Sequence, residues 1–104
     1  MRSLQERVMA DARSGHPCIR CGRQGEGLVY GRHYNGQRQH HYGKGMATKC
    51  HPFLVADFCD ICDKDFQEGS IDKNDDVGKD IYSEEFQHWI LMSLIRRADN
   101  GVIG

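Results

Sequence analysis

The sequence lacks the apolar segments that export and membrane insertion require. Its first twelve residues are charged and carry no apolar core of the kind found in signal peptides. No apolar run elsewhere approaches the roughly 20 residues that a helix needs to cross a bilayer. We therefore expect a soluble protein in a reducing compartment, with a cytoplasmic location and no membrane partner.

A surplus of either charge is also lacking, since 14 Lys and Arg stand against 15 Asp and Glu. The charges are nevertheless unevenly distributed. Basic residues outnumber acidic ones nine to three through Lys49, and acidic residues outnumber basic ones twelve to five from Cys50 onward. A basic half of this kind could meet the phosphates of a nucleic acid. Equally, the two halves could attract each other, or both could simply be solvated.

Internal repeats and a calcium-binding loop are missing as well. The acidic segment 71–80 is expected to be a loop. Compared with the EF-hand pattern, its glycine comes one position late and no glutamate stands at the twelfth position, which excludes an EF-hand. With 104 residues, the chain fits one domain, 1–104. A domain this short buries a modest core and often needs additional stabilisation, such as a bound metal ion.

The cysteines are expected to bind that metal ion. Their number is five, which does not suit a framework of disulfides, and four of them form the pairs Cys18-x-x-Cys21 and Cys59-x-x-Cys62. Four thiolates are a typical ligand set for a structural Zn²⁺, and they leave no open position for a catalytic water. The alternatives are reduced thiols in the core or a redox pair, and a redox pair normally comes singly beside a βαβ pattern, which is lacking here. Cys50 has no Cys-x-x partner and is expected to be a bystander.

Local patterns predict an α+β fold. Apolar residues at helical spacing predict a short amphipathic helix over 3–13. A strand is expected over 28–34, followed by the turn signal Asn35-Gly36. A second apolar run over 53–55 leads into the second cysteine pair, and a helix is expected over 59–67.

The last helix has the clearest pattern. Ser83 is expected to cap it, and Asn100-Gly101 to end it. Its predicted buried stripe consists of Phe86, Trp89, Ile90, Leu94 and Ala98. Three further apolar residues, Leu91, Met92 and Ile95, widen this stripe. We therefore expect the helix over 84–98 to pack on the N-terminal helix or to form a homodimer contact.

The order of these motifs resembles the HNH, or ββα-metal, nucleases. The segment Pro17-Cys18-Ile19-Arg20-Cys21-Gly22, followed by His33-Tyr34, is similar to the NinG (Rap) recombination nucleases of phages. The small YbcO-like prophage nucleases are closer, because that resemblance extends over Gly45–Lys49, Leu54-Val55-Ala56 and Gly101-Val102-Ile103. It implies a zinc-stapled, treble-clef-like ββα domain with flanking N- and C-terminal helices. It also implies a metal-dependent DNA endonuclease of phage or prophage recombination, working in the bacterial cytoplasm.

The resemblance assigns roles to individual residues. His33, at the end of the first strand, matches the general base that activates water, while His41 is the alternative in a second alignment. Asp63 stands where many members have a histidine ligand of the catalytic Mg²⁺ or Mn²⁺, and Arg32 stands where a metal-binding Asp or His is common. The basic residues expected to hold DNA are Arg32, Arg38, Lys44 and Lys49. Because Arg32 and Asp63 depart from the family pattern, a non-catalytic zinc module that binds nucleic acid or protein stays open.

Overall fold

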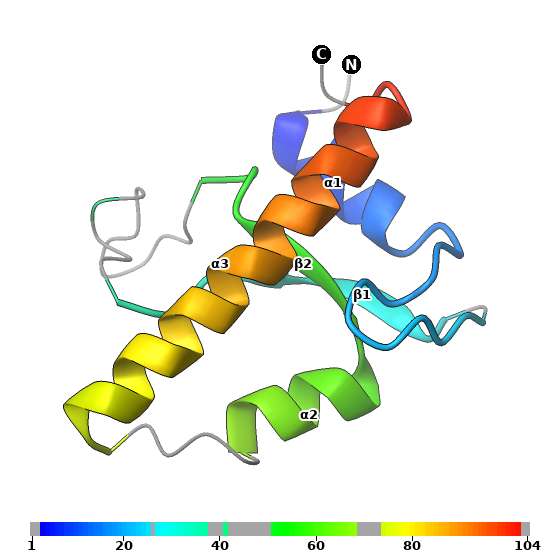
Figure 1. Ribbon diagram of the computed structural model, residues 1–104. Helices are drawn as coiled ribbons and strands as arrows, with labels where there is room; N and C mark the ends of the chain where they lie inside the picture. The colour runs from blue at the N-terminus through cyan, green and yellow to red at the C-terminus, as the bar shows by residue number, and fades with distance from the viewer. Residues whose placement is uncertain (1–2, 26, 38–40, 42–50, 69–73, 103–104) are drawn as a thin grey trace.

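The computed structural model describes residues 3–25, 27–37, 41, 51–68 and 74–102. Over this part of the chain, three helices surround a two-stranded antiparallel sheet (Figure 1). The order of elements is α1 (Leu4–Ala12), β1 (Val29–His33), β2 (Val55–Cys59), α2 (Asp60–Glu68) and α3 (Asp76–Asp99). The predicted α+β class is confirmed.

The N-terminal helix follows its apolar pattern closely. α1 begins after Ser3, whose side chain accepts a hydrogen bond from the backbone N–H of Glu6 at 3.2 Å, as a capping serine does. Val8 and Ala12 are fully buried, so the predicted apolar face of this helix is its packed face.

The hairpin pairs Val29 with Cys59 at one end and His33 with Val55 at the other. Because side chains alternate along a strand, Gly31 and His33 lie on one face of β1 and Arg32 on the other. The Gly31 face meets α1. A Cβ on Gly31 would lie only 2.6 Å from the Val55 side chain and 2.9 Å from Met9 Sδ, so glycine is what allows the helix to approach the sheet.

The opposite face of the sheet supports an aromatic core. Phe58 of β2 packs on Phe66 of α2 and Phe86 of α3, with ring centroids 5.6 Å and 6.0 Å away. Tyr34 and Tyr82 close the cluster against Phe86 at 5.3 Å and 5.9 Å. Burial of these rings holds α2 and α3 against the hairpin.

The last helix starts earlier than predicted. α3 begins at Asp76, and its cap is Asp75, whose carboxylate accepts the backbone N–H of Gly78 at 2.6 Å. The prediction that Ser83 caps this helix was therefore wrong, as was the assignment of 76–80 to a loop. Ser83 lies buried inside the helix, and its hydroxyl instead accepts the backbone N–H of Gln37 at 2.7 Å.

The buried stripe of α3 also differs in part from the prediction. Phe86 and Ile90 are buried as expected, but Ala98 is exposed, and the buried positions toward the C-terminus are Ser93 and Arg97. The three apolar residues expected to widen the stripe onto α1 are exposed instead: Leu91 by 57%, Met92 by 41% and Ile95 by 56%. Among the described residues, no helix is both long and apolar enough to cross a membrane.

Candidate metal centre

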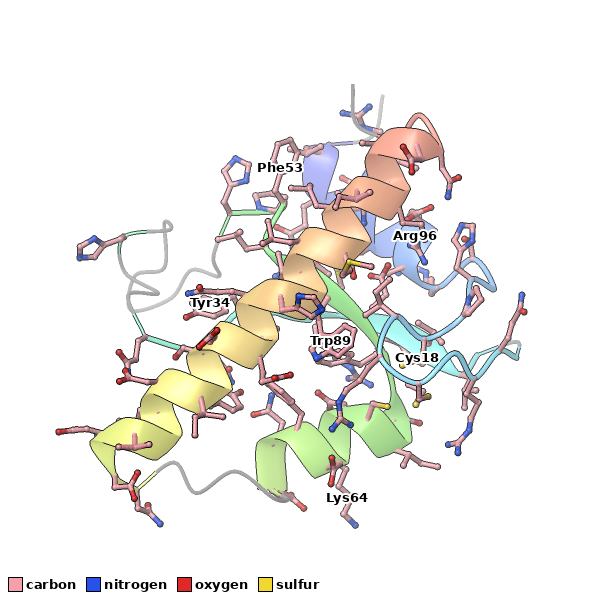
Figure 2. All side chains as sticks on the ribbon, in the orientation of Figure 1. Cys18, Tyr34, Phe53, Lys64, Trp89 and Arg96 are labelled. Atoms are coloured by element: carbon pink, nitrogen blue, oxygen red, sulfur yellow. The ribbon has the colours of Figure 1, made fainter. Side chains whose placement is uncertain are left out.

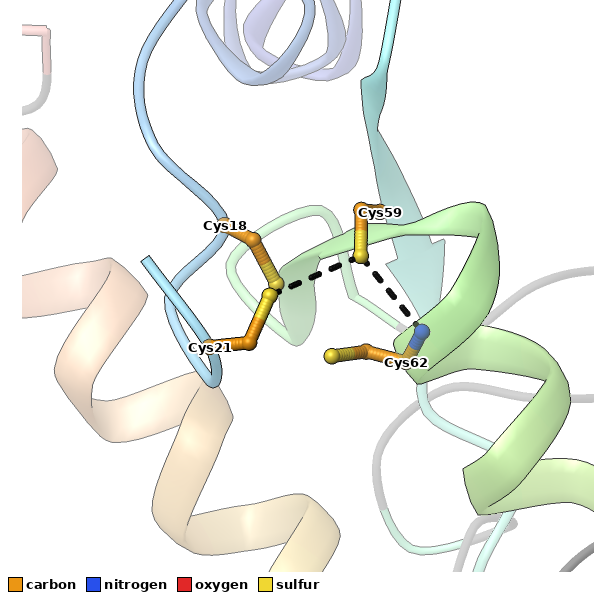
Figure 3. Close-up of side chains that lie close together, drawn as sticks. All are labelled: Cys18, Cys21, Cys59 and Cys62. Atoms are coloured by element: carbon orange, nitrogen blue, oxygen red, sulfur yellow. Dashed lines mark hydrogen bonds between the residues drawn. The ribbon is translucent and has the colours of Figure 1, made fainter. Parts of the chain in front are cut away.

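The two cysteine pairs come together at one point (Figure 3). Cys18 and Cys21 belong to the turn after α1, Cys59 is the last residue of β2, and Cys62 lies in the first turn of α2. All four Sγ atoms lie within 4.8 Å of one another. Among the described residues, no other group of three or more metal-ligating side chains lies this close together.

The sulfur spacing suits a tetrahedral ion. With metal–sulfur bonds of about 2.3 Å, the edges of a regular tetrahedron of sulfurs measure about 3.8 Å. The Sγ atoms of Cys21 and Cys59 are 3.7 Å apart, whereas a disulfide would bring them to about 2.0 Å. All four thiols are unbridged. The site could therefore hold a metal ion such as zinc, with every ligand position filled by sulfur.

The backbone shapes the first cysteine turn. The N–H of Cys18 donates to the carbonyl of Arg23 at 2.8 Å, and the N–H of Gly22 donates to the carbonyl of Cys18 at 2.9 Å. Gly22 has φ of 79°, a left-handed conformation that favours glycine. The turn is fastened to β2, because the N–H of Ile19 donates to the carbonyl of Asp57 at 2.9 Å.

Backbone N–H groups also point at the sulfurs. Arg23 donates to Cys21 Sγ at 3.5 Å, and Cys62 donates to Cys59 Sγ at 3.4 Å. Burial raises the pKa of the Cys18 thiol, but donors including the N–H groups of Cys21 and Cys59 outweigh it and lower this pKa to about 7. Burial and the neighbouring Cys21 thiol raise the pKa of Cys62 to about 12. A bound cation would favour the thiolate at every position.

The residues expected to form a catalytic centre are not gathered into one group. Asp63 lies beside the guanidinium of Arg32, at 3.7 Å, and Arg32 also binds the carboxylate of Asp60 at 2.9 Å. His33 follows Arg32 on the strand and therefore lies on the other face of the sheet, where both of its ring nitrogens are buried. His41 is exposed. The other predicted DNA contacts, Arg38, Lys44 and Lys49, lie outside the described residues.

Sequence reasoning missed a buried ionic cluster between α1, β2 and α3, formed by Asp11, Asp57, Arg96 and Arg97. Asp57 and Arg97 have no exposed surface, and they form an ion pair with each other. Arg96 bridges Asp57 to Asp11, which is 2.7 Å away, so it ties α3 to α1 (Figure 2). One signal was available: Arg97 continues the buried positions Phe86, Ile90 and Ser93 at helical spacing.

Burial and charge act against each other in this cluster. Burial raises the pKa of Asp57, and the two guanidinium groups partly offset that rise. Burial lowers the pKa of Arg97, and the Asp57 carboxylate offsets it. Arg97 also donates to the carbonyl of Val55 at 3.2 Å, and the N–H of Asp57 donates to Ser93 Oγ at 3.2 Å. The cluster is thus a hydrogen-bonded structural element with little access to solvent.

Fold and site together define a class: a small α+β protein with a four-cysteine centre that could hold a metal ion such as zinc. Comparison of the chain with protein-family models, with curated proteins and with solved structures finds no match.

Proposed function

We propose that the four cysteines bind one structural zinc ion and that the protein is a metal-dependent DNA endonuclease of the HNH type. The observation that supports this proposal is the arrangement around the sulfur cluster. A cysteine turn, a β-hairpin and a helix follow one another, and the second cysteine pair joins β2 to α2. That order is the one implied by the resemblance to the small prophage nucleases, and His33 is the last residue of β1 within it.

One chemical step can be written for His33, and it requires water and the phosphodiester to reach ring nitrogens that are buried in this structure. A neutral imidazole takes a proton from water, and the resulting hydroxide attacks the phosphorus of a phosphodiester. A new P–O bond forms, the bond to the leaving sugar oxygen breaks, and that oxygen takes a proton from solvent water. A Mg²⁺ or Mn²⁺ ion would stabilise the charge on the phosphate. Among the described residues, however, no second group of ligands fits such an ion, so no step is assigned to it.

Loss of the imidazole tests this proposal. In His33→Ala, nicking of plasmid or branched DNA in Mg²⁺ or Mn²⁺ should fall by about 10²- to 10⁴-fold, because a general base contributes that much. His16→Ala, in the segment between α1 and Cys18, is the matched control and should cut like the wild type. His41→Ala tests the second alignment. Circular dichroism and zinc content must be unchanged in each variant. Wild-type protein that nicks nothing, or His33→Ala that cuts normally, would sink the mechanism.

A second candidate is a non-catalytic zinc-stabilised protein that binds DNA. The contact that favours it is the one between Arg32, Asp60 and Asp63. The positively charged guanidinium of Arg32 stands where a metal cation would bind these two carboxylates. In this candidate, DNA binding is salt-dependent and cleavage is lacking.

Arg32→Asp separates the two candidates. The change removes a positive charge and adds a third carboxylate beside Asp60 and Asp63, which should tighten Mn²⁺ binding by on the order of tenfold. Isothermal titration calorimetry, or electron paramagnetic resonance of Mn²⁺, measures the Mn²⁺ dissociation constant. Arg20→Asp is the matched control, because Arg20 pairs with a different α2 carboxylate, Asp65, at 2.9 Å. If the wild type already binds Mn²⁺ as tightly as Arg32→Asp, the guanidinium does not block the site, and the second candidate loses its support.

A further inference from the structure

One row of exposed residues runs the length of α3. We call it the α3 seam, and it consists of Val77, Ile81, Glu84, His88, Leu91 and Ile95. Successive members are four, three, four, three and four residues apart, the heptad spacing that keeps a row on one side of a helix. Four of the six are large and apolar, and they are exposed by 47–68%.

This seam faces away from the core. The opposite side of α3 carries Phe86, Ile90 and Ser93, which are buried against the rest of the molecule. In Figure 1, α3 is the longest helix, and its N-terminal end extends past β2 toward the end of α2. A row of exposed Val, Ile and Leu at heptad spacing is typical of a surface that pairs with another helix.

The sequence of the seam is complementary to itself when it is reversed. We propose that the protein forms a homodimer in which two α3 helices pack antiparallel along their seams, with the twofold axis near residue 86. In this alignment Val77 lies opposite Ile95, and Ile81 opposite Leu91. At the centre, Glu84 of each copy lies opposite His88 of the other copy, so this polar contact occurs twice. Each Glu84 carboxylate thereby meets an imidazole that can donate an N–H.

The charges select this orientation. A parallel pairing would set Glu84 against Glu84 and leave two carboxylates side by side, which is unfavourable. Antiparallel pairing also brings the N-terminal end of each helix dipole beside the C-terminal end of the other. The partner that fits the seam is therefore a second copy of this chain. This inference depends on neither the zinc nor the nuclease proposal.

The expected dimer is weak. Residues 77–95 span about 28 Å of helix at 1.5 Å per residue. One helix seam of that length buries less than the roughly 800 Å² per partner of a standard stable interface. We therefore expect a dissociation constant in the micromolar range, so that the mass rises with protein concentration.

Sedimentation of the full chain over a range from micromolar to millimolar concentration tests the proposal. The mass should rise from 11.9 kDa toward twice that value. Leu91→Glu should raise the dissociation constant by at least about tenfold, since the change enters the twofold interface twice. Ile61→Glu is the matched control: Ile61 is 60% exposed on α2, away from the seam, and its replacement should leave the mass unchanged. A wild type that stays at 11.9 kDa throughout, or an equal effect of both variants, overturns the homodimer.

A charge exchange tests the antiparallel alignment. His88→Glu should dissociate the dimer, because Glu84 would then face a glutamate. Adding Glu84→Arg to His88→Glu should restore association by at least about tenfold in the dissociation constant. Glu84 and His88 are also neighbours within one helix, so melting curves of the dilute monomers measure that intrahelical effect separately from the effect on association. If the double variant stays monomeric while His88→Glu dissociates, the proposed pairing of Glu84 with His88 is wrong.

Discussion

Cys59→Ser is expected to unfold the protein and so to abolish any activity indirectly. Cys59 is fully buried at the end of β2, and its sulfur lies 3.7 Å from that of Cys21, on the turn that follows α1. Metal binding at such a site is folding free energy, since the unfolded chain does not hold the four sulfurs together. Removing the metal with a strong chelator should give the same result.

The expected size of this effect is comparable to, or larger than, the whole stability of a domain. Structural zinc sites contribute about 10–16 kcal/mol in small zinc peptides, whereas a whole domain is stable by about 5–15 kcal/mol.

Circular dichroism would follow the loss of α3, and fluorescence would follow Trp89, the single tryptophan of the chain. Trp89 packs against the core cluster that includes Cys18, so its environment should change with the metal site (Figure 2).

Cys50→Ser is the matched control for Cys59→Ser. Because Cys50 has no Cys-x-x partner, the variant should keep one zinc ion per chain and the wild-type melting curve. Zinc content is measured by elemental analysis of the dialysed protein. A cooperative melting transition that survives complete metal removal would contradict the proposed structural role of zinc.

The cysteine centre could be predicted because its signal is local. Each Cys-x-x-Cys pair fixes two sulfurs on one turn, and four thiolates suit one ion, whatever lies between the pairs. The start of α3 could not be predicted in the same way. Ser83 has the chemistry of a cap, but the structure uses its hydroxyl to accept the N–H of Gln37, 46 residues earlier. A contact at that separation leaves no periodic trace in the sequence.

The uneven charge distribution likewise depends on contacts that the sequence does not reveal. The basic N-terminal half suggested a surface for phosphates, yet Arg20 pairs with Asp65 and Arg32 with Asp60, both on α2. These contacts support the alternative in which the two halves attract each other. They do not test DNA binding, because three of the four basic residues predicted to bind it lie outside the described residues.

The burial of the C-terminal arginines is even harder to predict from the sequence. Basic residues in the last turn of a helix are ordinarily explained by the helix dipole. Here Arg97 is fully buried and pairs with Asp57, which is also fully buried. A pattern that treats every arginine as polar cannot separate an exposed cation from a buried one, since the difference depends on the carboxylate that β2 places opposite it.

Asp57→Ala is therefore expected to destabilise the protein by about 3–5 kcal/mol, the second largest effect after loss of the metal centre. The substitution leaves the guanidinium of Arg97 buried without its main counter-ion, and breaking one side of a buried ion pair costs about that much. Arg96 would keep Asp11 at 2.7 Å, so the contact between α1 and α3 should survive in part. Chemical denaturation of the zinc-loaded protein measures the change in the free energy of unfolding.

Removing both charges should cost less than removing one. The double variant Asp57→Leu with Arg97→Leu leaves neither a buried carboxylate nor a buried guanidinium, and exchanges of this kind are often close to neutral. In a double-mutant cycle with the single variants Asp57→Leu and Arg97→Leu, the double variant is therefore expected to cost less than the sum of the two single variants. Asp65→Ala, which breaks the half-exposed pair with Arg20, is the comparison and should cost below about 1 kcal/mol. If Asp57→Ala costs no more than Asp65→Ala, the buried cluster does not hold α3 on the sheet, and the packing of Phe86 and Ile90 alone must do so.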